Sequence, residues 1–256
     1  MTGELEGQTA VVTGAARGIG FAIAERFGEE GAAVVLADVS DDELEEAAAV
    51  LDDRDFSVAA ITCDVTDRAE TTSLVRETVE RFGGVDILVN NAGIASHASF
   101  ANLEPGEWDE VIDVNLTGAF NCSHAVVPEM VAGDGGSVVN ISSMAGRNIS
   151  YHAAANYTAS KWGLIGLTKH MAWDLGQHDI RVNAVCPGST LTPLTEGATT
   201  SEDREETERK IPLDRWARPH DHAEGVLYLV SDAASYLTGT VLEIDGGKQL
   251  GVRLEI

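Results

Sequence analysis

The chain alternates short apolar runs with longer segments in which apolar residues recur at helical spacing. The short runs are rich in β-branched residues, which is typical of strands. They span residues 9–13, 33–37, 58–61, 86–89, 136–141, 180–185 and 240–244. Continuous apolar strands that alternate with helices indicate a parallel sheet covered on both faces. We therefore predict an α/β fold, with a single doubly wound domain over residues 1–256.

The helical segments have recognisable ends. Helices are expected over residues 22–31, 41–51, 67–82 and 105–131, around Tyr157, and from about residue 221. Asp67 and Asp221 are predicted N-caps, and Gly83 follows the third helix as a stop signal. The polar stretch 195–210 interrupts the alternation after the sixth strand. We interpret it as a short lid helix within a lid region at 191–215, rather than as a helix that is merely solvated.

Composition restricts the compartment and the partners. Hydrophobic residues make up 44% of the 256 positions, enough for a sizeable core, and no stretch is long and apolar enough to cross a membrane. The first residues lack the basic and apolar regions of a secretory signal. The three cysteines are scattered among apolar residues, which favours buried, reduced thiols. We expect a cytoplasmic protein.

The charge balance is strongly acidic. There are 42 Asp and Glu against 17 Lys and Arg, a formal net charge of −25, and only four of the bases are lysines. Such a field repels phosphates, so nucleic acid and anionic membranes are not expected as partners. Self-repulsion of this size is relieved by salt, because the Debye length falls to ~3 Å at 1 M. We predict a protein from a salt-accumulating organism; the alternative is an ordinarily acidic mesophilic protein.

A glycine-rich turn follows the first strand and opens the first helix. Its glycines are Gly14, Gly18 and Gly20, with Arg17 and Ile19 between them. The spacing differs from Gly-x-Gly-x-x-Gly, but the position suits a dinucleotide, whose pyrophosphate would lie at the helix N-terminus.

Asp38, at the end of the second strand, can accept both hydroxyls of the adenosine ribose and would repel a 2′-phosphate. No base follows it, since the next residue is Val39, although Arg17 could still reach such a phosphate. We predict NAD rather than NADP as the cofactor. Asp64 and Val65 are expected near the adenine, and Asn91, Ala92 and Gly93 beside the cofactor's ribose.

Tyr157 and Lys161 stand four residues apart in a helical segment and therefore share a face. A neighbouring ammonium favours the phenolate, so the pair could move a proton on and off an alcohol near neutral pH.

At this point the chain resembles the short-chain dehydrogenase/reductase family over essentially its whole length. The matching motifs are Thr13-Gly-Ala-Ala-Arg-Gly-Ile-Gly20, Asp64-Val65, Asn90-Asn-Ala-Gly93, Asn115, Ile141-Ser-Ser143, Tyr157-x-x-x-Lys161, Asn183-Ala-Val-Cys-Pro-Gly188 and Ile244-Asp-Gly-Gly247. The resemblance implies a Rossmann-type domain with a seven-stranded parallel sheet, a homotetramer, and hydride transfer between NAD(P) and a carbonyl or alcohol.

The resemblance also implies roles for individual residues. Tyr157 would be the general acid/base, and Lys161 would lower its pKa and hydrogen-bond the nicotinamide ribose. Ser143 would bind the reacting oxygen, and Asn115 would hold a water that links Lys161 to bulk solvent. Pro187, Gly188, Thr190 and Thr192 would line the nicotinamide pocket. The separation of Ser143 from Tyr157 is 14 positions, one longer than usual for the family, which leaves Ser142 as a weaker candidate for the serine's role.

The substrate pocket is expected in three loops. Its candidate residues are Ala95, Ser96 and His97, then Arg147, Asn148 and His152, then Ser189 to Thr195. These polar groups favour a small polar substrate, such as a sugar or sugar acid, over a steroid or long acyl chain. Arg147 has an equally good alternative role, in pairing with surface acids.

Three other functions remain open. They are a 3-oxoacyl-(ACP or CoA) reductase, a polyol dehydrogenase, and a non-catalytic NAD-binding sensor. The sensor would be expected to lack Tyr157 or Lys161, and both are present. No metal site is expected, because Asp221 of His220-Asp-His222 is better explained as a helix cap than as part of a ligand set.

Overall fold

All seven strands lie in one parallel sheet. The computed structural model describes residues 3–196 and 199–251. The strand order is β3-β2-β1-β4-β5-β6-β7, and every neighbouring pair is parallel. The strands are β1 (Thr9–Thr13), β2 (Ala33–Asp38), β3 (Val58–Thr62), β4 (Ile87–Asn90), β5 (Gly136–Ile141), β6 (Ile180–Pro187) and β7 (Val241–Ile244). The predicted fold class is confirmed.

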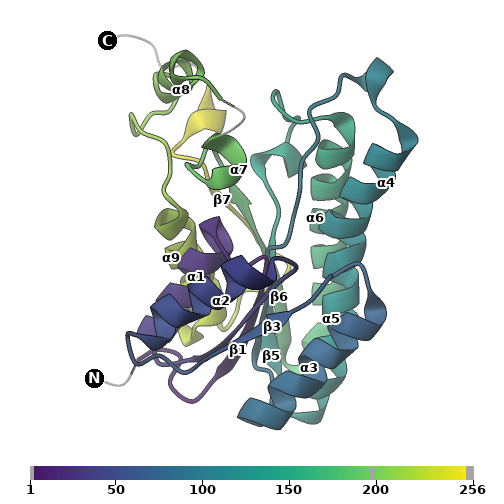
Figure 1. Cartoon of the computed structure of the whole chain (residues 1–256), viewed down its shortest axis with the longest axis vertical. Coiled ribbons are helices and arrows are strands. Elements are labelled where there is room, and N and C mark those ends of the chain that lie inside the picture. The colour runs from purple at the N-terminus through teal and green to yellow at the C-terminus, as the bar shows by residue number, and fades with distance from the viewer. Residues whose placement is uncertain (1–2, 197–198, 252–256) are drawn as a thin grey trace.

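Helices cover both faces of the sheet (Figure 1). The helices are α1 (Gly18–Glu29), α2 (Asp41–Asp52), α3 (Arg68–Phe82), α4 (Pro105–Ile112), α5 (Gly118–Ala132), α6 (Ala155–Leu175), α7 (Pro193–Glu196), α8 (Ser201–Glu208) and α9 (Pro219–Val230). α1, α2 and α9 pack on one face, and α3, α5 and α6 pack on the other. α7 and α8 stand beyond the sheet, at the end where its strands terminate.

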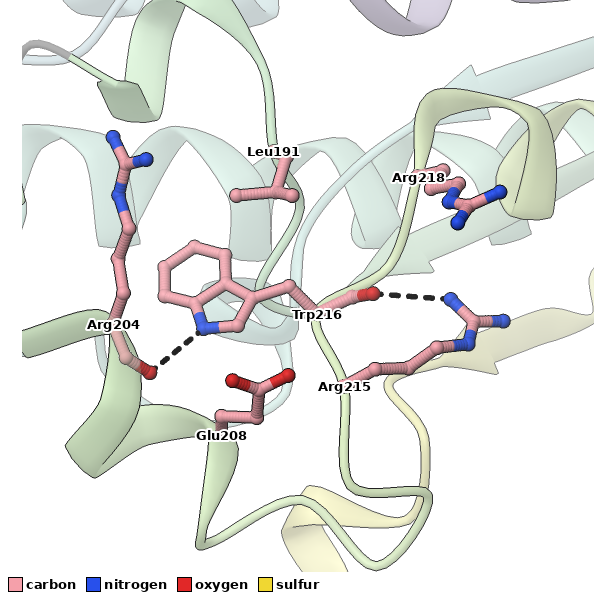
Figure 2. Close-up of a pocket in the computed structure, with 6 residues that line it drawn as sticks. All are labelled: Leu191, Arg204, Glu208, Arg215, Trp216 and Arg218. Carbon is pink, nitrogen blue, oxygen red and sulfur yellow. Dashed lines mark hydrogen bonds between the residues drawn. The ribbon is translucent and has the colours of Figure 1, made fainter. Parts of the chain in front are cut away.

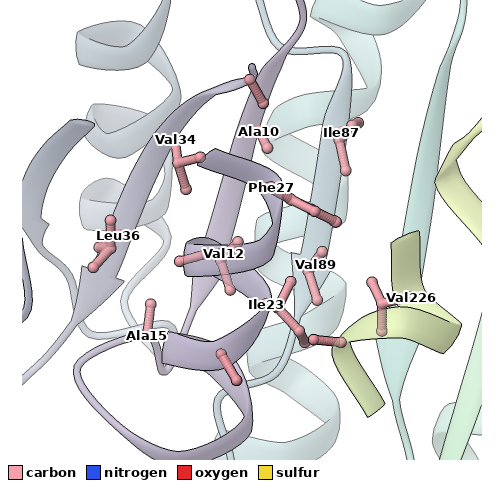
Figure 3. Close-up of a cluster of buried hydrophobic side chains, with 14 of the residues drawn as sticks. Ala10, Val12, Ala15, Ile23, Phe27, Val34, Leu36, Ile87, Val89 and Val226 are labelled. Atoms are coloured by element: carbon pink, nitrogen blue, oxygen red, sulfur yellow. The ribbon is translucent and has the colours of Figure 1, made fainter. Parts of the chain in front are cut away.

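Alternate side chains of each strand enter two different cores. Val12 and Val34 point to the side of α1, where Phe27 is fully buried among them (Figure 3). Val11 and Val35 point to the opposite side, toward α3 and α5. A strand whose two faces are both covered needs apolar residues at every position, which explains the continuous apolar runs of the sequence.

The helix boundaries follow the expected signals with two differences. Asp67 caps α3 by accepting from the backbone of Ala69 and Glu70, and Gly83 ends it with φ +92°. Asp221, predicted as an N-cap, is instead the third residue of α9, where its carboxylate accepts from the Arg218 backbone. The reason is that Pro219, which lacks an N–H, already begins the helix.

The expected helix 105–131 is divided. Between α4 and α5 the chain makes a π-helical turn at Asp113–Thr117, with Asn115 buried inside it. Such turns insert one extra residue into a helix and often occur at functional sites. The segment 195–210 contains α8, so the expected helix is confirmed; whether it acts as a lid stays a prediction.

The site is positioned by the strand order. After β1 the chain continues to β2 and β3 on one side, and later to β4 and onward on the other. The crevice where the order reverses, outside the carboxyl ends of β1 and β4, is where open α/β sheets bind ligands.

The structure also bears on the cysteines and on membrane-spanning helices. Cys63, Cys122 and Cys186 are free and buried. Among the described residues, no helix is both long and apolar enough to span a bilayer.

Candidate active site

The glycine turn is shaped by contacts that leave no room for side chains. Gly14 and Gly18 have φ +62° and +63°. A Cβ on Gly20 would lie 2.2 Å from the Gly14 carbonyl oxygen. The Asn91 amide donates to the carbonyls of Thr13 and Gly14, at 3.0 and 2.8 Å, and so joins the end of β4 to the turn.

The first amides of α1 remain available. Arg17 precedes the helix, and its side chain makes no capping hydrogen bond. Unsatisfied N–H groups at a helix start, behind a turn kept free of side chains, suit a pyrophosphate. The predicted residues Gly14, Gly18 and Gly20 are therefore brought together in a cradle that fits a dinucleotide. Ile19 packs its side chain against the core instead.

The adenosine end of the crevice is acidic. The Asp38 carboxylate accepts from the backbone N–H of Ala16 and of Ser40, both at 3.2 Å. Arg17, the cation that could have bound a 2′-phosphate, pairs with Glu43 on α2 at 2.9 Å. Glu43 belongs to a first helical turn that also holds Asp41 and Asp42.

Asp64 and Val65 are arranged by their own loop. The Asp64 carboxylate accepts from the backbone N–H and the hydroxyl of Thr66, each at 2.8 Å. Val65 is buried, and a Cβ on Gly118 would lie 2.5 Å from its methyl group. The two residues thus fix the end of β3 against α5, and their place beside an adenine stays a prediction.

Tyr157, Lys161 and Ser143 converge where β5 ends and α6 begins. Tyr157 and Lys161 share one face of α6, and the Lys161 Nζ lies 5.6 Å from the centroid of the tyrosine ring. The Ser143 hydroxyl hydrogen-bonds the Tyr157 hydroxyl. Ser142 is turned away, because its hydroxyl donates to the Lys161 backbone carbonyl at 2.9 Å. The geometry therefore favours Ser143 over Ser142 as the serine of the site.

Burial shifts the pKa values of both Tyr157 and Lys161. Burial raises the pKa of Tyr157 above its usual value, and the hydrogen bond with Ser143 only partly opposes this shift. Burial lowers the pKa of Lys161 to about 8. The expected lowering of the Tyr157 pKa depends on Lys161 together with an oxidised nicotinamide, and it stays a prediction for the chain with bound cofactor. The Lys161 ammonium donates to the Ile141 carbonyl at 2.9 Å.

Asn115 joins the site from the π-helical turn. Its Oδ1 accepts from the Ile94 N–H at 2.8 Å, and its Nδ2 donates to the Ile94 carbonyl and the Ser160 hydroxyl at 2.9 and 3.1 Å. A Cβ on Gly93 would lie 3.2 Å from Asn115 Oδ1 and 3.5 Å from Lys161 Nζ. Both polar atoms therefore lie close to Gly93, and the water that Asn115 would hold stays a prediction.

The loop after β6 is placed over the glycine turn. The Thr192 side chain lies 3.8 Å from where a Cβ of Gly18 would be. Pro187 ends β6. Gly188 packs directly on Asp245, because a Cβ added to Gly188 would lie only 2.6 Å from the Asp245 Cα. Thr192 thus lies close to the glycine turn, and its contact with a nicotinamide stays a prediction.

Thr190 does not line that pocket. Its hydroxyl is buried, donates to the Gly188 carbonyl at 3.0 Å, and lies 2.7 Å from Nε2 of His222. Because the only hydroxyl proton is given to Gly188, Nε2 of His222 carries the proton of the second bond. The prediction that the Thr190 side chain lines the nicotinamide pocket is wrong, because this side chain is buried against α9 through its contact with His222.

Most of the expected substrate residues are held by other parts of the chain. Arg147 pairs with Glu243 of β7 at 2.6 Å, so its alternative role is the one found. Asn148 makes a long contact with Gln249, at 3.5 Å, and its carbonyl accepts from Trp162.

The remaining hydroxyls are also used. Ser96 donates to Asn156 at 3.0 Å, Ser189 accepts from Lys248 at 2.8 Å, and Thr195 donates to the Thr190 carbonyl at 2.6 Å. The two imidazoles of the loops are less engaged. His97 contacts the His152 carbonyl through Nδ1 at 2.6 Å, and both side chains are exposed.

Asn156 is a site residue that the sequence did not single out. It is fully buried, immediately before Tyr157. Its Oδ1 accepts from the Tyr157 N–H at 2.8 Å and from Ser96, and its Nδ2 donates to the Glu107 carbonyl of α4 at 2.8 Å. A polar residue in the first turn of a helix is the signal that could have revealed it.

His220-Asp-His222 is not a ligand cluster. His222 is buried, whereas Asp221 forms a two-bond ion pair with Arg215, which holds the pKa of Asp221 at about 2. Within residues 3–196 and 199–251, no group of three His, Cys, Asp or Glu side chains is arranged to hold a metal ion.

Comparison with known proteins gives full-length matches. The sequence profile of a family described as enoyl-(acyl carrier protein) reductase matches residues 14–249. A 3-oxoacyl-(acyl-carrier-protein) reductase FabG of Thermotoga maritima is 42% identical over 243 residues, covering 95% of this chain and 98% of that protein. A trans-4-hydroxycyclohexanecarboxylate dehydrogenase of Sinomonas cyclohexanicum is 41% identical over 254 residues, covering 96% and 95%.

A solved structure also matches over nearly the whole chain. A short-chain type dehydrogenase/reductase from Mycobacterium marinum superposes with a TM-score of 0.92 at 36% identity, over 96% of this chain and 97% of that one.

Proposed function

Because the chain belongs to the short-chain dehydrogenase/reductase family, we propose that it is an NAD-dependent oxidoreductase. Its proposed substrate is a secondary alcohol or carbonyl on a small polar molecule, namely a sugar or sugar acid. Members of this family are oxidoreductases that act on a CH–OH or carbonyl group with a nicotinamide cofactor. The observation that carries the proposal is the convergence of Tyr157, Ser143 and Lys161 beside the open surface of Gly93.

A nicotinamide cofactor, when bound, would supply the hydride chemistry, and the residues of the chain handle the proton. Tyr157 gives its hydroxyl proton to the substrate oxygen in reduction and takes it back in oxidation. Ser143 holds that oxygen by a hydrogen bond. The Lys161 ammonium lies close enough to stabilise negative charge on the phenol oxygen as the proton leaves, because its interaction acts in a site shielded from water.

The proposed preference for NAD rests on charge. Asp38 ends β2 with its carboxylate beside the glycine turn, and Glu43 occupies the nearest guanidinium, that of Arg17. A 2′-phosphate would meet Asp38 with no unpaired arginine from the turn to neutralise it.

The nature of the substrate is inferred from the loops and from one relative. The site residues Ser96, Asn148, His152, Ser189 and Thr195 are polar, and His97 and His152 expose imidazoles that can bind hydroxyls or a carboxylate. The Sinomonas relative is named for a ring that bears a secondary alcohol and a carboxylate, which is chemically close to a sugar acid.

A 3-oxoacyl thioester reductase is the second candidate, favoured by the name of the Thermotoga relative. Against it stands the acidic balance of the chain, because an acyl carrier protein is expected to need a basic docking surface. A polyol dehydrogenase uses the same catalytic residues and differs only in the substrate.

The function is tested by following reduction of NAD⁺ and NADP⁺ in molar KCl across sugars, sugar acids, polyols and 3-hydroxyacyl thioesters. We expect NAD⁺ with a sugar or sugar acid to give the highest kcat/KM. Tyr157→Phe should lose nearly all turnover and still bind NADH. Turnover retained by this variant would contradict the catalytic role of Tyr157, and the fastest reaction with a thioester would favour the second candidate.

The coenzyme preference has its own test. Asp38→Ser combined with Val39→Arg removes the repelling carboxylate and supplies a cation for the 2′-phosphate. We expect the ratio of kcat/KM for NAD⁺ to that for NADP⁺ to fall by about two orders of magnitude, equivalent to ~3 kcal/mol. A wild-type enzyme with a higher kcat/KM for NADP⁺ than for NAD⁺ would contradict the proposal that Asp38 excludes the 2′-phosphate.

We also propose that the chain forms a homotetramer in the cytoplasm. The outer faces of α5 and α6 expose Phe120, Trp162 and Trp173, the last with 85% of its surface accessible. Large exposed aromatic side chains on adjoining helices are typical of protein interfaces. Light scattering in molar KCl should give the mass of four chains, and a monomeric mass would contradict the proposal.

A further inference from the structure

A second pocket lies on the outer side of the segment that follows β6. It has a volume of about 290 Å³, and its described walls are Leu191, Arg204, Glu208, Arg215, Trp216 and Arg218. Figure 2 shows the indole of Trp216 between Leu191 and Glu208, with arginines on either side. The size is at the lower limit of small-molecule sites, ~300 Å³, and suits a compact ligand.

The pocket is separate from the crevice above the glycine turn. Leu191 and Thr192 are neighbours in the chain, and only Thr192 contacts the glycine turn. The Leu191 N–H donates to the Ala217 carbonyl at 3.0 Å, and the Ala217 N–H donates to Ser189 at 2.9 Å. This short parallel bridge closes one wall of the pocket and divides it from the coenzyme side.

The walls of the pocket are firmly held. The Trp216 indole N–H donates to the Arg204 carbonyl at 3.0 Å, which attaches α8 to the segment before α9. Arg215 donates to the Trp216 carbonyl at 3.0 Å and makes two bonds of 2.7 Å to Asp221. A ligand would therefore meet a preformed surface, which lowers the entropic cost of binding.

Arg218 is the unusual member. Among the arginines of residues 3–196 and 199–251, Arg218 alone has a guanidinium without a hydrogen bond, an ion pair or an aromatic ring as a partner. Its backbone N–H donates to Asp221. The described walls hold three arginines and one carboxylate, that of Glu208.

We propose that this pocket binds a small organic monocarboxylate. The planar guanidinium of Arg218 matches a carboxylate with two parallel hydrogen bonds. Leu191 and the edge of Trp216 supply an apolar wall for the body of the ligand. The carboxylate of Glu208 on the same wall favours a monoanion, because the second charge of a phosphate dianion would be repelled by it.

The test uses 4-bromobenzoate as the probe, with 4-bromobenzamide as its neutral isostere. Binding is measured by titration calorimetry at fixed ionic strength, and the bromine is located by anomalous scattering from crystals grown with the probe. We expect the acid to bind and the amide not to bind, with the bromine between Leu191 and Trp216 and the carboxylate on Arg218.

Two variants with the same change in charge make the test specific. Arg218→Ala should weaken binding of 4-bromobenzoate at least tenfold. Arg76→Ala removes an equally charged side chain from α3, where it pairs with Glu77 and Glu80, and should change the affinity less than twofold. Equal binding by wild type and Arg218→Ala, equal binding of acid and amide, or a bromine beside Tyr157 would each overturn the proposal.

The proposal does not depend on the chemistry at Tyr157. The dehydrogenase activity of Arg218→Ala, measured without the probe, should equal that of wild type, because Arg218 lies outside the crevice. A protein without dehydrogenase activity that still binds the probe through Arg218 would refute the proposed function alone.

Discussion

The hydroxyl of Tyr157 is placed by a neighbour that takes no part in the chemistry. The Asn156 side-chain amide accepts two hydrogen bonds and donates one, which leaves only one N–H of the amide unused. These bonds attach the start of α6 to Ser96 and to α4. Because these contacts fix the backbone of the catalytic residue itself, we regard Asn156 as a positioning residue.

Replacing Asn156 tests this role. Asn156→Ala leaves the Ser96 hydroxyl and the Glu107 carbonyl unpaired, and should lower kcat by roughly 10²-fold, the effect expected of a displaced catalytic group. The dissociation constant of NADH should change less than twofold. Asn102→Ala, at an exposed asparagine in the turn before α4, is the control and should leave kcat unchanged. A loss of NADH affinity equal to the loss of kcat would point to general unfolding.

His222 makes stability depend on pH. Burial lowers its pKa in the folded chain to about 4, below the value of 6.5 in the unfolded chain, and Nδ1 is buried without a hydrogen-bond partner. As pH falls through 6.5, His222 becomes protonated in the unfolded chain but stays neutral in the folded chain. Stability contributed by the neutral imidazole is therefore complete above pH 6.5 and is lost between pH 6.5 and 4.

The corresponding prediction compares urea unfolding at pH 7.5 and pH 5. His222 should account for about 2 kcal/mol of the stability lost at pH 5. His222→Gln keeps an N–H donor for Thr190 and cannot titrate, so its loss between the two pH values should be smaller by that amount. His170→Gln, at an exposed histidine of α6, should lose as much as wild type. Identical losses in all three proteins would contradict the assignment.

At the scale of elements, the turn between β1 and α1 is the tightest junction of the site. Gly20 is a helical residue whose Cβ position is occupied by the Gly14 carbonyl at 2.2 Å and the Asn91 amide at 2.5 Å. Both contacts involve groups that hold β4 against the turn. A side chain there would separate α1 from β4 and open the cradle.

Gly20→Ala should therefore weaken NADH binding by about an order of magnitude or more, at least ~1.4 kcal/mol. Gly106→Ala in α4 is a matched control, because nothing lies within 4 Å of its Cβ position. The control should keep wild-type affinity and gain up to about 1 kcal/mol of stability from the lower entropy of the unfolded chain. Fluorescence titration with NADH measures the first effect, and an unchanged affinity in Gly20→Ala would contradict it.

At the scale of the whole molecule, charge is the dominant property. The formal net charge is −25, and acidic residues crowd elements such as α2 and α8. Many of the arginines are already committed to local pairs, for example Arg26 with Glu30 and Arg54 with Glu29. The unpaired carboxylates repel one another, and the compact state confines them more closely than the unfolded chain does.

We accordingly propose adaptation to high salt and predict that KCl stabilises the fold. The melting temperature should rise by several degrees between 0.1 and about 1 M KCl, where screening approaches completion. Sucrose at equal osmolality is the control, because it stabilises proteins without screening charge. A protein that is equally stable in salt-free buffer would contradict the proposal.

The sequence by itself determined the features that depend on local pattern. The order of strands and helices, the glycine turn, the acid that ends β2 and the shared face of Tyr157 and Lys161 all follow from periodicity and turn chemistry within a few residues. The family resemblance then placed Ser143 and Asn115 in the same site, and the structure brings them together with Lys161 and Tyr157.

Only the tertiary structure decided the rest, because contacts between distant residues and the loss of water leave no local pattern. Arg147 is bound by Glu243, 96 positions away, and Thr190 is turned toward His222. Arg17 forms an ion pair with Glu43, whereas Arg218 lines a pocket. The pKa of Tyr157 belongs to the same class: the lysine four residues away is visible in the sequence, but the burial that raises the tyrosine's pKa exists only in the folded chain.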